Sequence, residues 1–352
     1  MDVNDQSYIN PDEFEPEQRN ESKLSGYKRV CAKLGLSMII YFVCRSITGF
    51  IQVFFSNFTN SLGESIVSLI NNSIALLFIY VIPLLATMLI FNSFKLYKGK
   101  YRELYQKPKR LARALGTFPA SYGLGHGVAM LTLLVSHLIT SNLGVSGYIE
   151  ELFRPSTMEM PTNLISIIYL VFMLVVIAPL FEEFWCRGIM YDALKPYGTG
   201  IAIIISSVIF GLMHGSLYMF FYTTAYGLAL GYIRYATGSL YTVTILHAIV
   251  NAIAAGALIL STLSEATYPE SRLITTIFYI YAIAFLALLV VGVIVFLSKI
   301  PAMRKYKIEN AWPEKNPWKK TARFFVSIPV IIMMILAANE FSNFILMRLF
   351  VF

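Results

Sequence analysis

The chain has 352 residues, of which 57% are hydrophobic and 14% are charged, and its formal net charge is +8 at pH 7. A soluble globular domain has roughly a quarter of its residues charged, so this composition excludes an ordinary soluble domain and predicts an integral membrane protein. Lys and Arg gather in the connections between apolar runs, which favours anionic lipid over nucleic acid as their partner.

The apolar runs predict an all-α, polytopic transmembrane bundle. A helix needs about 20 mostly apolar residues to cross a bilayer, and on this basis we expect about nine spans, or eight if one run is re-entrant or interfacial. The expected spans cover residues 32–54, 66–92, 117–140, 163–185, 200–215, 218–235, 240–261, 273–298 and 324–346.

These runs divide the chain into four regions. They are a polar tail (1–31), N-terminal transmembrane helices (32–162), a core (163–262), and C-terminal transmembrane helices with a basic connection (263–352). Basic residues precede the first span and fill the connections after the second and eighth spans, so the positive-inside rule puts the N-terminus in the cytoplasm. We expect a multi-pass protein of the cell membrane, with a bacterial cell as its setting. The sequence leaves the oligomeric state open.

Several polar side chains interrupt the predicted core. A charge at the bilayer centre costs about 2.5–3.5 kcal/mol on insertion scales, so such residues indicate function by default. Three sets fall on three predicted spans: Glu182, Glu183 and Arg187; Phe210 and His214; His247 and Asn251. Glu183 and Arg187 are four positions apart and are expected to form an ion pair, whereas Glu182 points about 100° away. Glu182 is expected near the cytoplasmic end of its span, and His214 deeper.

Other polar features favour structural roles. His126 and His137 are expected to make interhelical hydrogen bonds, and Arg45 to have a structural partner or to snorkel. Gly238 and Ser239 are typical of a turn followed by a helix start. Taken by itself, the set that contains Glu182 could be an ion pair at the membrane edge. Three polar sets within the predicted core instead favour a functional site.

At these residues the chain resembles the CAAX protease and bacteriocin-processing family (CPBP, or Abi), which includes the type II CAAX prenyl endopeptidases. That family is marked by EExxxR, FxxxH, and HxxxN or HxxxD on separate helices. Here the motifs read EEFWCR from Glu182, FGLMH from Phe210 and HAIVN from His247. The resemblance covers about 163–262, including the Gly-Ser pair that precedes the last motif.

The resemblance implies an intramembrane endopeptidase that hydrolyses a peptide bond in a membrane-associated peptide or protein. Glu182 matches the family's general base and would bind the attacking water together with His214. His247 and Asn251 match the residues proposed to stabilise the oxyanion. The remaining motif residues would have supporting roles: Glu183, Arg187 and Phe210.

Three alternatives stay open. A zinc-dependent version of the same protease could use Glu182, His214 and His247 as ligands, although no cofactor is expected. A non-catalytic immunity or scaffold protein of the same fold would also keep the motifs. A transporter would show inverted repeats, and none is visible. Membrane lipids, and a peptide or lipid-anchored protein as substrate, are the expected partners.

Overall fold

The computed structural model describes residues 16–59, 63–92, 105, 107, 111–143, 164–305 and 317–350. All regular elements within these ranges are helices, which agrees with the predicted all-α fold. Six described helices are long and apolar enough to cross a membrane, and they cover Leu24–Phe55, Ser65–Ile90, Gly116–Ile139, Leu164–Tyr197, Leu240–Glu265 and Arg272–Lys299. The protein is therefore a helical membrane protein, and the expected number of about nine spans stays a prediction.

The N-terminal part contains three long helices, and the second of them consists of three segments. Helix α1 (Pro16–Thr59) begins inside the segment that the sequence predicted to be a polar tail. Helices α2 (Glu64–Ala75) and α3 (Ile82–Ile90) are joined by a π-helical segment, η2 (Leu76–Val81), and all three pack against α1. The third long helix is α6 (Leu111–Leu143).

The fourth long helix is continuous from Leu164 to Tyr197 and consists of α8 (Leu164–Phe172), η3 (Met173–Ile177), α9 (Ala178–Glu183), η4 (Phe184–Met190), α10 (Tyr191–Leu194) and η5 (Lys195–Tyr197). The predicted end at residue 185 is therefore wrong. Glu182, Glu183 and Arg187 made the sequence look interfacial there, but Glu183 and Arg187 form a fully buried pair. Since paired charges can be buried, the helix continues past them.

Three further helices complete the core through two tight turns. Helices α11 (Thr199–Leu212) and α12 (Leu217–Thr237) form a hairpin, in which Gly215 has φ +72° and Ser216 caps α12 by accepting from the Met219 amide. Gly238 ends α12 in the left-handed region, and Ser239 caps α13 (Leu240–Thr262) by accepting from the Thr242 amide. The predicted turn and helix start are confirmed.

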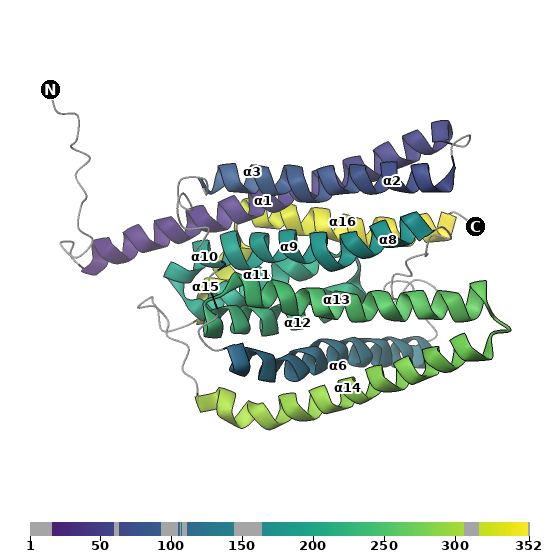
Figure 1. The fold of residues 1–352 in the computed structure, drawn as a ribbon. Helices are drawn as coiled ribbons and strands as arrows, with labels where there is room; N and C mark the ends of the chain where they lie inside the picture. Colours follow the sequence, from purple (N-terminus) through teal and green to yellow (C-terminus); the bar gives the residue numbers. More distant parts are fainter. Residues whose placement is uncertain are drawn as a thin grey trace.

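The remaining elements are η6 (Leu263–Thr267), α14 (Arg272–Lys305), α15 (Pro317–Phe325) and α16 (Ile328–Phe350). Figure 1 shows the long helices lying side by side along one axis, with α14 against α6 at one side of the bundle and α1 with α3 at the other. Helix α16 packs on α1, and α13 lies between the fourth helix and α14. Large apolar side chains on α14 face outward, as expected of a helix that contacts lipid.

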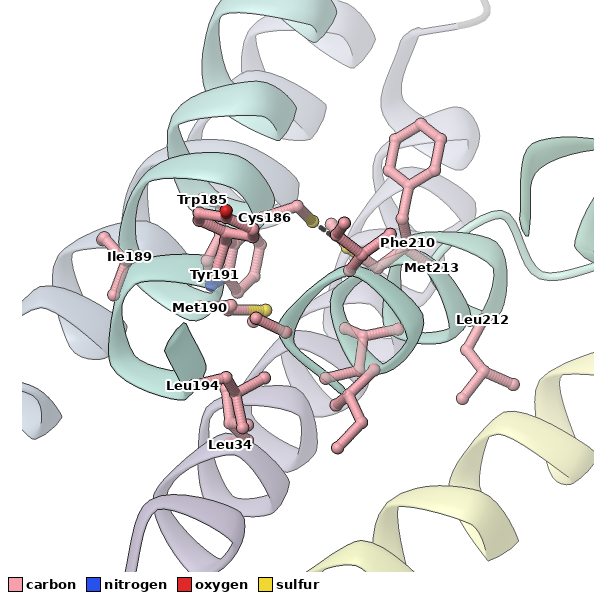
Figure 2. Packing of buried hydrophobic residues seen from close by; sticks show 14 of the residues in the cluster. Leu34, Trp185, Cys186, Ile189, Met190, Tyr191, Leu194, Phe210, Leu212 and Met213 are labelled. Atoms are coloured by element: carbon pink, nitrogen blue, oxygen red, sulfur yellow. Dashed lines mark hydrogen bonds between the residues drawn. The ribbon is translucent and has the colours of Figure 1, made fainter. Parts of the chain in front are cut away.

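The core lies where the fourth helix meets α11. Trp185, Cys186 and Phe210 are almost completely buried, and Figure 2 shows Cys186 directed toward Met213. The Cys186 Sγ and Met213 Sδ atoms are 3.9 Å apart. The polar motif residues are thus set in a close-packed apolar environment, which fixes their positions.

Candidate active site

The EExxxR motif begins at the end of α9 and continues into the π-helical segment η4. A π-helical turn shifts the backbone hydrogen bonds, and such bulges are frequent at functional sites. Two carbonyls here accept from side chains of other helices: Asn251 Nδ2 donates to Leu174 O at 2.8 Å, and Arg234 Nε donates to Arg187 O at 3.2 Å. Helices α13 and α12 therefore hold the fourth helix before the motif and at its last residue.

Glu183 is the centre of the buried charges. Its Oε1 accepts from Arg187 Nη1 at 2.9 Å, so the predicted ion pair forms, and both side chains are fully buried. The same oxygen lies 2.8 Å from His247 Nδ1. Because a carboxylate is an acceptor, this contact assigns the Nδ1 proton to His247. Glu183 thus joins its own helix to α13, a link that the spacing of the motifs did not predict.

Glu182 has a different environment from its neighbour. The Glu182 side chain is 13% exposed, whereas the Glu183 side chain is fully buried. Glu182 Oε2 lies 3.9 Å from His247 Nε2, and Tyr80 of η2 donates its hydroxyl to Glu182 Oε1 at 3.5 Å. The two adjacent carboxylates are therefore unequal, and Glu182 is the more accessible. Tyr80 was missed because a tyrosine in an apolar run has no distinguishing pattern.

The Phe210 ring contacts three other motif residues. It contacts the rings of His214 and His247, with centroid separations of 4.9 and 5.6 Å, and the Arg187 guanidinium lies 4.3 Å from its centroid. His214 Nδ1 lies 2.8 Å from the Phe210 carbonyl. Since a carbonyl only accepts, Nδ1 carries the proton and Nε2 of neutral His214 is left as an acceptor. Members of all three predicted sets therefore meet at one place, whereas Asn251 bonds to the Leu174 carbonyl earlier on the fourth helix.

Glu182 and His214 lie at a similar depth, which corrects the expectation that His214 is much deeper. Glu182 is 15 positions before Tyr197 and His214 is 15 positions after Thr199, on either side of the same turn. At about 1.5 Å per residue both are about 22 Å from that turn. The expectation was wrong because the fourth helix does not end at residue 185. Among the described residues, no hydrogen bond joins Glu182 to His214 directly.

A glycine makes room for the buried arginine. A Cβ on Gly227 of α12 would lie 2.9 Å from Arg187 Nη2 and 3.1 Å from Ser207 Cβ. Within the described part of the chain, Arg187 Nε and Nη2 and Glu183 Oε2 have no hydrogen-bond partner. The pair therefore depends on its single direct bond, on His247 and on the Phe210 ring.

The residues expected to be structural have partners elsewhere. Arg45 pairs with Glu340 of α16, with 3.4 Å between Nε and Oε2, so it is a structural pair. His126 bonds to the Tyr122 carbonyl of its own helix at 3.1 Å, and only its ring reaches across to α12 and α14. The interhelical hydrogen bond expected of His126 is therefore replaced by ring packing. His137 lies on the same helix, α6.

The zinc alternative requires Glu182, His214 and His247 to converge. No group of three or more His, Cys, Asp or Glu side chains in the described ranges is arranged to hold a metal ion. The Nδ1 atoms of both histidines bond to Glu183 and to a backbone carbonyl, which leaves their Nε2 atoms. Metal-ligating histidines commonly donate their other ring N–H in this way, so the zinc alternative stays a prediction.

The comparisons with known proteins agree with the motifs. Residues 164–253 match the family model described as type II CAAX prenyl endopeptidase Rce1-like, and this segment contains all three motifs. An uncharacterized protein of Mycoplasma capricolum subsp. capricolum is 25% identical over 192 residues, which are 51% of this chain and 54% of that protein. The match thus spans about half the length of that relative. No solved structure matches the chain.

Proposed function

We propose that this protein, whose residues 164–253 support its assignment to the CAAX protease (CPBP) family, is an intramembrane endopeptidase that hydrolyses a peptide bond in a membrane-associated peptide or protein. One observation carries the proposal: the Phe210 ring contacts His214 and His247, and His247 Nε2 lies 3.9 Å from Glu182 Oε2, so residues far apart in the sequence come together. The reaction would take place in a multi-pass protein of the cell membrane, with a peptide or lipid-anchored protein as substrate and without a metal.

Glu182 would be the general base. Its carboxylate accepts one proton of a water molecule, and His214 Nε2, which is left as an acceptor, binds the other. As the proton moves to Glu182, the water oxygen forms a bond to the peptide carbonyl carbon and the carbonyl oxygen becomes an oxyanion. Glu182 then returns the proton to the amide nitrogen as the C–N bond breaks, which leaves an amine and a carboxylic acid that retains the second water proton and then loses it to solvent.

His247 and Asn251 would stabilise the oxyanion. Asn251 Nδ2 has two N–H groups, and only one is needed for the Leu174 carbonyl. His247 Nδ1–H is held by Glu183, so Nε2 donates only when the ring is an imidazolium. The hydrogen bond from Nδ1–H to Glu183 Oε1 holds the ring in this orientation. Loss of one oxyanion donor costs about 10²–10³ in kcat in enzymes where it has been removed.

Purified full-length protein in lipid nanodiscs tests the proposal. The substrates are quenched fluorescent peptides with and without a prenylated C-terminus, and the variants are Glu182→Gln and His214→Ala. A matched control is His126→Ala, because YGLGH (122–126) repeats the local geometry of FGLMH (210–214), with the histidine bonded to the carbonyl four positions earlier.

We expect Glu182→Gln and His214→Ala to lose at least about 10²-fold in kcat/KM, and His126→Ala to keep most of its activity. Peptide cleavage that continues unchanged in folded Glu182→Gln would refute the mechanism. A Glu182→Gln variant that keeps its biological effect in cells would instead favour a non-catalytic immunity or scaffold role.

A further inference from the structure

A second polar cluster lies beside the candidate site, outside the segment that matches the family. It contains Tyr41, Arg45 and Ser46 of α1 and Glu340 of α16. These helices belong to the first and last parts of the chain, and Figure 1 shows α16 lying along α1. Charged residues at this depth are costly without partners, so the cluster needs an explanation.

The cluster is directed at the turn that carries His214. Met213 O accepts from the Tyr41 hydroxyl at 2.8 Å and from Arg45 Nη1 at 3.2 Å. This carbonyl lies at the C-terminal end of α11, where carbonyls lack helical partners and the helix dipole attracts a cation. Tyr41 and Arg45 therefore cap α11 at the residue immediately before His214.

The fit between Arg45 and this turn is close. Gly215 follows His214 with φ +72°, and a Cβ there would lie 2.6 Å from Arg45 Nη2. The guanidinium thus fills the space that a side chain at Gly215 would need. On its other side, Arg45 Nε faces Glu340 Oε2 at 3.4 Å, and Ser46 donates to Glu340 Oε1 at 3.0 Å. Glu340 neutralises the arginine and holds it in place.

We propose that Tyr41 and Arg45, held by Glu340, are positioning residues that fix the His214 turn for the reaction. The inference rests on the proposed function, because positioning matters only if His214 binds the reacting water. It assigns a task in the site to the first and last long helices, which lack family motifs. His214 has no interhelical hydrogen bond of its own among the described contacts, so its ring is placed by its backbone.

Two measurements on full-length protein in nanodiscs test whether Tyr41 and Arg45 hold the turn that carries His214. Amide hydrogen exchange over residues 211–217 reports whether the turn is held, and it needs no activity. Peptidase kinetics report whether His214 is positioned. The variants are Tyr41→Phe, Arg45→Met and the conservative Arg45→Lys. The control Tyr281→Phe removes a hydroxyl that donates to the Ile253 carbonyl in another part of the bundle.

We expect Tyr41→Phe and Arg45→Met to speed exchange of the 211–217 amides and to lower kcat about tenfold, corresponding to one lost hydrogen bond. KM should stay within about twofold. Arg45→Lys should recover part of kcat, since it can still pair with Glu340, and Tyr281→Phe should match the wild type.

Unchanged amide exchange at residues 211–217 in both Tyr41→Phe and Arg45→Met would overturn the inference that these residues hold the turn. Faster exchange with unchanged kcat would overturn the positioning role, because the turn would then move without effect on the reaction. If the wild type shows no Glu182-dependent cleavage, the proposed peptidase fails, and the exchange data alone still decide whether Tyr41 and Arg45 hold the turn.

Discussion

Neutralising Glu183 separates the structural from the chemical role of the buried pair. Glu183→Gln leaves the Arg187 guanidinium fully buried, with Nε and Nη2 already lacking partners. Removing one partner of a buried ion pair costs about 3–5 kcal/mol. We therefore expect the single variant to unfold at markedly lower temperature or denaturant concentration, with low activity as a consequence.

The double variant Glu183→Gln with Arg187→Met distinguishes the two roles. Replacing a buried ion pair by hydrophobic residues of similar volume is often neutral for stability; here only Arg187 becomes hydrophobic, so we expect folding to recover in large part. The amide oxygen introduced by Glu183→Gln can still accept from His247, but a hydrogen bond involving an ionised group is about twice as strong as a neutral one. Loss of the carboxylate should therefore leave kcat about tenfold below wild type, or about 1.4 kcal/mol.

Thermal unfolding of purified variants and peptide-cleavage kinetics supply both numbers. A double variant that is stable and has wild-type kcat would refute the argument that His247 uses the charge of Glu183. A single variant as stable as the wild type would refute the argument that Arg187 needs its partner.

Further predictions concern packing, a hydrogen bond and metal. Gly227→Ala should destabilise the protein by about 1–3 kcal/mol through overpacking against Arg187, whereas Gly116→Ala, with nothing within 4 Å, should not, as thermal unfolding would show. Tyr80→Phe removes the hydroxyl that donates to Glu182 Oε1 and should lower kcat a few-fold at unchanged unfolding temperature. Treatment with phenanthroline should leave peptide cleavage intact; loss of activity that zinc restores would establish the zinc alternative instead.

The sequence predicted contacts within a helix better than contacts between helices. The Glu183–Arg187 pair follows from four-residue spacing alone, and it forms. The bond from His247 to Glu183 joins residues 64 positions apart, and spacing cannot indicate how two helix faces are rotated toward each other. For the same reason the sequence left Arg45 without an identified partner, although Glu340 stands in the last apolar run.

The length of the fourth helix was mispredicted because the sequence does not show which charges are buried. Glu182, Glu183 and Arg187 resemble residues at a membrane edge, and spacing indicates that Glu183 and Arg187 pair but not that both are fully buried. The π-helical segments were also invisible, since helical periodicity is read from the alternation of polar and apolar residues, and a run such as Met173–Ile177 is apolar on every side.

The common depth of Glu182 and His214 constrains any substrate. Both lie about 22 Å from the turn between the fourth helix and α11. An extended chain covers about 3.3 Å per residue, so a peptide that enters along the helices from that end needs about seven extended residues to bring its scissile bond to Glu182. A substrate anchored closer to its cleavage site than this must enter sideways from the lipid. The length of free chain between anchor and scissile bond therefore decides by which route a substrate can reach Glu182, before any side chain is recognised.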